Sequence, residues 1–176
     1  MGYSNFEVDA MLDSLTVLVD TREQDTPAFR RRMKGLGCPF VRQKLDFGDY
    51  ACRYMDTDGN PVDMSNRFCV ERKMNLDELC QCFTKGRARF EREFERAKAA
   101  GATIHLVVEN ACWESAFEGE YRSRLNPSAL IASLLAWSIR YGAKIYFCTA
   151  DTSGPLIYKI LRYELKEYLE RGCYGK

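Results

Sequence analysis

Residues 68–73 read Phe-Cys-Val-Glu-Arg-Lys, three apolar residues followed by one acid and two bases. A short apolar run of this kind is typical of a buried strand, and here the charged residues stand at its carboxyl end. Side chains alternate along a strand, so Glu71 and Lys73 are expected on the same face. The stretch therefore predicts an acid and an ammonium group side by side at the end of a buried strand.

The residues before this stretch predict further strands that carry acids at their ends. Residues 15–19, Leu-Thr-Val-Leu-Val, indicate a buried strand that ends on Asp20. Residues 40–45 alternate as a half-exposed strand does, and the Gly-Asp turn around Asp49 leads into another strand through Tyr54. Residues 56–60, Asp-Thr-Asp-Gly-Asn, predict a hairpin turn, with 68–73 as its return strand.

Helices and strands alternate in the rest of the chain. Thr26-Pro27 marks the start of a short basic helix closed by Gly35 and Gly37, and Asn75 followed by Glu78 marks the start of another. The remaining elements are a helix from Gly86 to Gly101, a strand at 103–108, a loop with Glu114, Glu118 and Glu120, a helix from 126 to about 141, a strand at 143–148 and an amphipathic helix at 153–170. This order predicts an α/β fold, a mixed sheet with helices on both faces.

Length and composition favour one globular domain. The chain has 176 residues, 46% of them hydrophobic, which is enough for one sizeable core. We find no repeat and no linker, so we expect a weakly tied N-terminal arm over residues 1–14 and a single domain over 15–176. The formal net charge of +1 gives no support for a polyanionic partner, so any nucleic-acid contact must come from local clusters of bases.

Several classes of protein are disfavoured by the same composition. No apolar run is long enough to cross a membrane and no secretory leader is visible, so we expect a cytoplasmic protein, nuclear if its host is eukaryotic, and not secreted. The eight cysteines lack paired C-x-x-C spacing, which favours reduced thiols over a zinc site. The single histidine, His105, lies in an apolar run and is interpreted as a buried strand residue. We expect no small-molecule cofactor.

Acids at the strand ends and one lysine form the candidate site. They are Asp20 with Glu23, Asp49, and Glu71 with Lys73. Converging carboxylates suit a hard cation such as Mg²⁺ or Mn²⁺, which supplies an activated water and neutralises charge on a phosphate. The lysine can orient that water or stabilise the developing charge. Each acid alone could equally be an ordinary turn or surface residue, so the hypothesis depends on the set.

Several ordered motifs resemble those of XPF-type (ERCC4-domain) structure-specific endonucleases. They are Val-Asp-Thr-Arg-Glu at 19–23, Gly-Asp-Tyr at 48–50, Val-Glu-Arg-Lys at 70–73 followed by Asp77, and Lys-Gly-Arg at 85–87. The resemblance covers about residues 15–150. It implies a restriction-endonuclease-like (PD-(D/E)XK) fold and metal-dependent cleavage of one DNA strand near flaps, forks or junctions.

The resemblance also implies a role for each matching residue. Asp49 and Glu71 would be the principal metal ligands, with Asp20 supporting them directly or through water, and Lys73 would be the catalytic lysine. The remaining motif residues would shape the site or contact substrate: Arg22, Glu23, Arg72 and Asp77. DNA contacts are expected from Arg22, Arg72 and Arg87.

Other interpretations stay open. A non-catalytic DNA-binding pseudonuclease scaffold would share the fold, and a sequence-specific restriction-type endonuclease would share the metal centre. The basic cluster of Arg30, Arg31, Arg32 and Lys34 is equally compatible with phosphate contact and with a solvated helix face. A homodimer through the last two helices is as plausible as a monomer whose surface is covered by Tyr158, Tyr163 and Tyr168.

Overall fold

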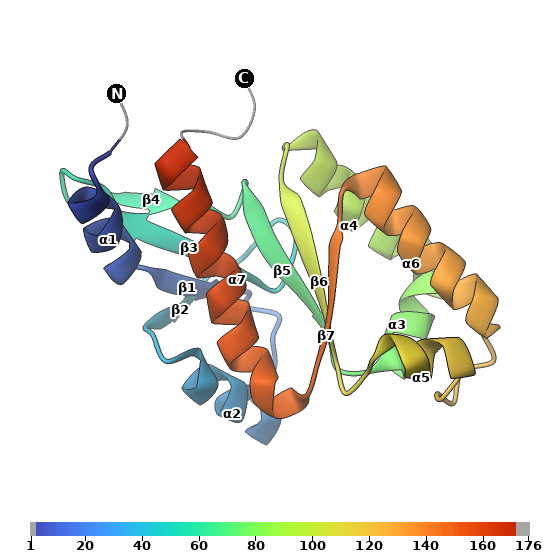
Figure 1. Cartoon of the computed structure of the whole chain (residues 1–176). Coiled ribbons are helices and arrows are strands. Elements are labelled where there is room, and N and C mark those ends of the chain that lie inside the picture. The colour runs from blue at the N-terminus through green and yellow to red at the C-terminus, as the bar shows by residue number, and fades with distance from the viewer. Residues whose placement is uncertain (1–2, 172–176) are drawn as a thin grey trace.

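A single mixed sheet forms the centre of the molecule in the computed structural model, which describes residues 3–171 (Figure 1). The strands lie in the order β2-β1-β3-β5-β6-β7, and β4 pairs with β3 outside this path. Their bounds are β1 Thr16–Val19, β2 Phe40–Arg42, β3 Tyr50–Met55, β4 Pro61–Asp63, β5 Phe68–Lys73, β6 Thr103–Glu109 and β7 Lys144–Cys148. Residues 1–2 and 172–176, which belong to the expected arm and domain, lie outside the described residues.

The pairing of the strands divides the sheet into two parts. β1 is parallel to β2 and antiparallel to β3, whereas β5, β6 and β7 are parallel. The two parts meet where Tyr50 of β3 pairs with Val70 of β5. The hairpin prediction was partly wrong, because the turn at 56–60 leads into the short strand β4 and not into β5. β4 begins on Pro61, which lacks an N–H to donate, as is usual in edge strands.

Helices cover both faces of the sheet, as the order of elements predicted (Figure 1). α1, α2 and α7 pack on one face, and α3, α4, α5 and α6 pack on the other. Their bounds are α1 Asn5–Asp13, α2 Pro27–Leu36, α3 Leu76–Phe83, α4 Arg87–Ala99, α5 Trp113–Glu118, α6 Pro127–Tyr141 and α7 Ala150–Arg171. The α/β class is confirmed. The end of β5 lies between the two helical layers.

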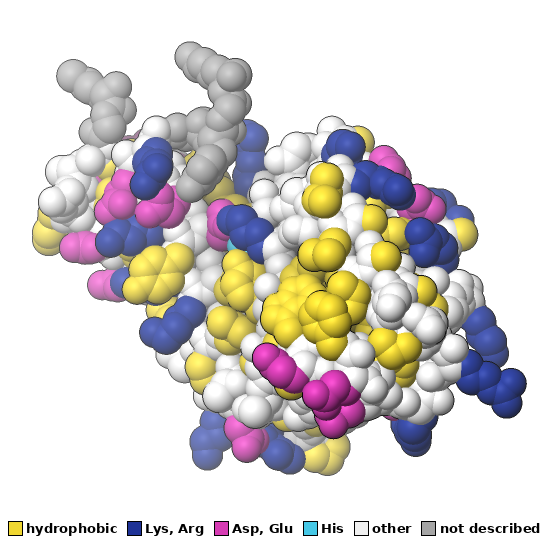
Figure 2. All heavy atoms as spheres, turned by 45° about the vertical axis from the view of Figure 1, so that its right-hand side comes forward, with side chains coloured by type: hydrophobic (Ala, Val, Ile, Leu, Met, Phe, Trp, Pro, Cys, Tyr) yellow, Lys and Arg dark blue, Asp and Glu magenta, His cyan; other side chains and the backbone are white. Residues whose placement is uncertain are grey.

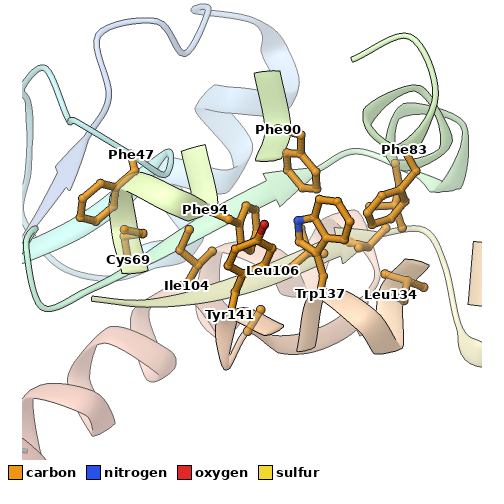
Figure 3. Close-up of a cluster of buried hydrophobic side chains, with 14 of the residues drawn as sticks. Phe47, Cys69, Phe83, Phe90, Phe94, Ile104, Leu106, Leu134, Trp137 and Tyr141 are labelled. Carbon is orange, nitrogen blue, oxygen red and sulfur yellow. The ribbon is translucent and has the colours of Figure 1, made fainter. Parts of the chain in front are cut away.

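A cluster of aromatic rings fixes α3, α4 and α6 against β6 (Figure 3). Trp137 is fully buried, and its ring meets Phe83 edge-on with the centroids 5.1 Å apart. Phe90, Phe94 and Tyr141 surround the same indole. Such pairs contribute about 0.5–1.5 kcal/mol each beyond their burial, so this cluster holds the helices beside the β5 end in a fixed position.

Two segments differ from the sequence expectations. The N-terminal arm was expected to be weakly tied, but Ser4 caps α1 and Val8, Met11 and Leu12 are buried against the rest of the protein. The expected loop after β6 contains the short helix α5, capped by Cys112.

Three expectations about the class of protein can be compared with the described residues. No helix in residues 3–171 combines the length and apolar character needed to cross a bilayer. The seven cysteines in these residues are free thiols, and Cys173 lies outside them. His105 is 1% exposed in β6, in agreement with its interpretation as a buried strand residue.

Candidate active site

The end of β5 places an acid and a lysine on one face of the sheet. Lys73 Nζ lies 2.5 Å from Glu71 Oε1, and both residues are less than a tenth exposed. The ammonium group also lies 5.3 Å from the centre of the Phe90 ring on α4. Strand alternation accounts for the shared face, and α4 packs beside it.

Asp49 is held next to this pair by the strand pairing. Its N–H donates to Val70 O at 2.8 Å, and its Oδ2 accepts from the N–H of Arg72 at 2.8 Å. Gly48 makes this approach possible: its φ is +71°, and a Cβ there would lie 2.6 Å from Cys69 Sγ. The Gly48 N–H donates to Glu93 Oε1 at 2.9 Å. A glycine before the aspartate is therefore required by space as well as by backbone conformation.

Asp49 and Glu71 are two buried acids beside the single ammonium group of Lys73. Burial, followed by the neighbouring Glu71, raises the pKa of Asp49 well above its usual value. Burial also raises the pKa of Glu71, although Lys73 opposes this shift. Glu71 Oε2 is buried and has no hydrogen-bond partner among the described residues. A divalent cation would neutralise both carboxylates and bind the unpartnered Oε2 of Glu71. The oxygen ligands of Asp49 and Glu71 therefore fit a hard metal ion.

The protonation of Lys73 follows from the same contacts. Burial alone would lower the pKa of Lys73, but the carboxylate of Glu71 outweighs burial and raises it. The side chain is therefore an ammonium group at neutral pH. It can stabilise negative charge and orient a water, but it holds its proton too tightly to act as a general base.

Asp20 is close to this centre but already fully engaged. Its Oδ1 accepts from the backbone N–H and the Nε–H of Arg22, both at 2.7 Å. Its Oδ2 accepts from the N–H of Leu45 at 2.8 Å and from Arg22 Nη2 at 3.2 Å. All four lone-pair directions are used, so in this arrangement Asp20 orients Arg22 and leaves no oxygen for a metal. In residues 3–171 no three Asp, Glu, His or Cys side chains gather around one metal position.

A closed ring of ion pairs lies on the opposite face of β5. Arg32 donates to Glu109 Oε1 at 2.9 Å and to Glu23 Oε2 at 3.1 Å. Arg72 donates to Glu109 Oε2 at 3.2 Å, and its Nη2 lies 3.8 Å from Glu23 Oε1. The Tyr50 hydroxyl donates to Glu23 Oε2 at 2.6 Å and accepts from Arg32 Nε. We call these five residues the ion ring.

The ion ring changes the interpretation of three residues. Arg72, expected to contact DNA, has a side chain only 14% exposed and is committed to two carboxylates. Glu23 binds arginines and does not join Asp49 and Glu71. Arg32 does not belong to the basic surface cluster, since it is 5% exposed. Two other members of that cluster, Arg30 and Arg31, form exposed ion pairs with Asp25 and Asp151.

The two remaining motif residues lie on the far side of the site. Asp77, on α3, accepts hydrogen bonds from the backbone N–H groups of Arg122 and Ser123. Arg87 is exposed at the start of α4, and its guanidinium lies 5.0 Å from the centre of the Trp137 ring. Asp77 therefore fixes a loop, whereas Arg87 keeps a surface position compatible with phosphate contact.

Sequence reasoning missed Glu93 and Glu109. Glu93, on α4, is 8% exposed and accepts from the backbone N–H of Gly48. Glu109 is 3% exposed and follows the apolar run of β6. An acid at the end of a buried strand was the very signal used for Asp20, so Glu109 could have been found in the same way.

A cleft of about 1450 Å³ opens over the Glu71 and Lys73 pair. Its other walls come from α3, from the turn and first part of α4, and from the loop that joins α5 to α6. A mixed sheet with helices on both faces and acids and a lysine at the end of a central strand defines the restriction-endonuclease-like class of folds.

The family follows from comparison with known proteins. The ERCC4 domain family matches residues 19–160, and the chain belongs to this family. Its fold is similar to that of XPF from Aeropyrum pernix, with a TM-score of 0.63, 23% identity, and coverage of 92% of this chain and 66% of that one. The structure of XPF from Aeropyrum pernix in complex with DNA matches with a TM-score of 0.61 and 22% identity. This match covers 86% of this chain and 65% of that one. The chain thus spans just under two thirds of the length of these structures. No curated protein matches it in sequence.

Proposed function

We propose that this chain is an Mg²⁺- or Mn²⁺-dependent endonuclease that hydrolyses one strand of branched DNA, such as a flap, fork or junction. The observation that carries the proposal is the pair of Glu71 and Lys73 on the floor of an open cleft, with the carboxylate of Asp49 held next to them at the β5 end. Membership of the ERCC4 domain family and the DNA complex of the similar XPF structure support the choice of substrate.

The carboxylates of Asp49 and Glu71 would hold the cation. When bound, such a cation neutralises charge on the scissile phosphate and lowers the pKa of a water. Lys73 then contributes its ammonium charge beside the phosphate and can hold a water in line for attack. Arg22, with a side chain that is 55% exposed and anchored by Asp20, is the neighbouring group best placed for a further phosphate contact.

Mutation of the site tests this function directly. Asp49→Asn, Glu71→Gln and Lys73→Met should each abolish cleavage of flap, fork and junction DNA in Mg²⁺ or Mn²⁺. Asp46→Asn is the matched control. It makes the same chemical change as Asp49→Asn, but at an exposed residue outside the site. Undiminished cutting by Asp49→Asn and Glu71→Gln would refute the site. Binding without cleavage by the wild type in either metal would favour the pseudonuclease scaffold, and cutting of linear duplex at one reproducible sequence would favour a restriction-type enzyme.

We also propose that the chain forms a homodimer through the surface of α6 and α7. Leu135 and Ile139 on α6 are 50% and 84% exposed, and Tyr163 on α7 is 60% exposed. Figure 2 shows hydrophobic side chains gathered on the side of the molecule that carries β7 and α6. Ile139→Glu should convert a dimer into a monomer by light scattering, whereas Met55→Glu on β3 should not. A wild-type monomer would reject the dimer.

A further inference from the structure

The loop over residues 119–126 forms one wall of the cleft above Glu71 and Lys73. It joins α5 to α6, and five of its residues line the cleft: Arg122, Ser123, Arg124, Leu125 and Asn126. The opposite wall includes Lys85 in the turn between α3 and α4, and Arg89 on α4. A DNA strand bound across the cleft would therefore lie next to this loop.

Asp77 holds this loop in a fixed conformation. Its Oδ1 accepts from the backbone N–H groups of Arg122 at 2.7 Å and Ser123 at 3.1 Å, and its Oδ2 accepts from Arg122 Nε at 3.1 Å. Across the loop the Tyr121 hydroxyl donates to Leu125 O at 2.8 Å. A loop ordered in this way does not lose the conformational entropy of ordering when it binds a ligand.

The basic side chains of the cleft are exposed to solvent. The Arg122 side chain is 89% exposed, and Asp77 engages only its Nε, so both Nη groups face solvent without a hydrogen-bond partner in the described part of the chain. Arg124, Lys85 and Arg89 are also exposed, and no residue within 3–171 forms an ion pair with them.

The acids on the cleft walls, in contrast, accept hydrogen bonds from protein donors. Glu78 accepts from the N–H of Met74 at 2.7 Å, and Glu93 accepts from that of Gly48 at 2.9 Å. The exposed rim of the cleft is therefore cationic although the whole chain carries a net charge of only +1. A polyanion approaching the floor meets positive charge first.

We propose that loop 119–126 binds the sugar–phosphate backbone of DNA beside the phosphate that is cut, with Arg122 and Arg124 as the phosphate contacts and Asp77 as a positioning residue. The free Nη groups of an arginine whose Nε is anchored present a fixed, planar pair of donors that matches phosphate oxygens. The inference rests on the proposed function, since that function makes the cleft the site of cutting. In this proposal Asp77, the acid that follows the Val-Glu-Arg-Lys motif, positions the loop and does not bind the metal.

DNA binding measured without cleavage tests the loop separately from the chemistry. We would compare Arg122→Ala/Arg124→Ala with Arg53→Ala/Arg67→Ala, which removes two cations near the opposite ends of β3 and β5 from the site. The probe is a fluorescent flap duplex in EDTA, titrated at several salt concentrations. Each phosphate contact contributes about 0.9 to the slope of log K against log salt, so the loop variant should lose about 1–2 of that slope and the control variant none.

The position of Asp77 predicts a different kinetic signature from that of a metal ligand. Asp77→Asn should raise KM more than it lowers kcat, and it should weaken DNA binding in EDTA, because the loop arginines lose their anchor. A fall in kcat with unchanged binding would place Asp77 at the reacting centre and overturn its positioning role.

The two proposals fail in distinguishable ways. A wild type that cleaves while both double variants bind with the same salt slope overturns the loop inference and leaves the endonuclease intact. A wild type that binds through the loop arginines but never cleaves supports the loop and overturns the endonuclease. Absence of any DNA binding by the wild type overturns the loop inference.

Discussion

Two arginines on the same helix should differ sharply in what they contribute to stability. Arg30 and Arg32 both lie on α2, two residues apart. Arg30 pairs with Asp25 on the surface, and its side chain is 70% exposed. Arg32 is 5% exposed and joins the ion ring. Replacing each by Met changes helix propensity very little, so the comparison isolates the environment of the guanidinium.

The contacts give the size of the effect. Arg32→Met removes charge-assisted hydrogen bonds to Glu23 and Glu109 and a third bond to Tyr50. Hydrogen bonds to charged groups contribute about 1.5–3 kcal/mol each, and losing one partner of a buried ion pair costs about 3–5 kcal/mol. We expect Arg32→Met to lose about 3–5 kcal/mol of unfolding free energy, because both carboxylates stay buried. Arg30→Met should stay close to wild type.

Urea denaturation followed by circular dichroism measures both variants. In a chain of this length each kcal/mol lowers Tm by about 2–4 °C, so in a thermal melt Arg32→Met should unfold about 6–20 °C below wild type. Arg32→Lys keeps a charge but not the planar fork, and it should recover only part of the loss. Equal small losses in Arg30→Met and Arg32→Met would refute the reasoning that the ion ring supports the fold.

Three further outcomes are expected. Gly59 has a φ of +79° and nothing within 4 Å of an added Cβ, so Gly59→Ala should lower the free energy of unfolding by about 1 kcal/mol in urea denaturation. Gly48→Ala should lower it clearly more and reduce cleavage, because the added Cβ would collide with Cys69. Equal losses in the two variants would contradict the steric argument. Burial raises the pKa of Glu164, but His105 and Lys144 outweigh burial and lower it from 4.5 to about 2. The carboxylate thus gives stability above pH 4.5 that is lost as pH falls toward 2, and Glu164→Gln should flatten the curve of unfolding free energy in that window. Mg²⁺ or Mn²⁺ at about 100 times its Kd should stabilise the wild type by about 2.7 kcal/mol, measured as a thermal shift that Asp49→Asn abolishes.

The fold was largely accessible from the sequence because its long elements carry strong periodic patterns. The apolar runs of β1, β5, β6 and β7 and the caps of α2 and α3 were predicted near their observed places. The short strand β4 and the six-residue helix α5 were missed, since elements of that length have too few residues to show a period. α1 was a different kind of miss, because Ser4 and Glu7 form a capping box that the sequence displays.

The candidate site was accessible only where it follows strand geometry. Glu71 and Lys73 share a face by alternation, and Asp49 joins them through pairing of adjacent strands. Glu109 lies 77 positions from its partner Arg32, and Arg122 lies 45 positions from Asp77, and no local pattern specifies such contacts. The order of the motifs indicates which residues belong to the site. The roles of Glu23, Arg72 and Asp77, however, are determined by the packing of α2 and of loop 119–126.

The alternation of β5 explains why the Glu-Arg-Lys sequence carries its three charges consecutively. Glu71 and Lys73 project into the cleft, and Arg72 projects to the opposite face, into the ion ring. The backbone N–H of Arg72 also donates to Asp49, so the residue between the acid and the lysine fixes the third member of the site. The ion ring therefore locks the strand end on which the acids and the lysine stand, and loosening the ring should shift Asp49 relative to Glu71 without touching either side chain.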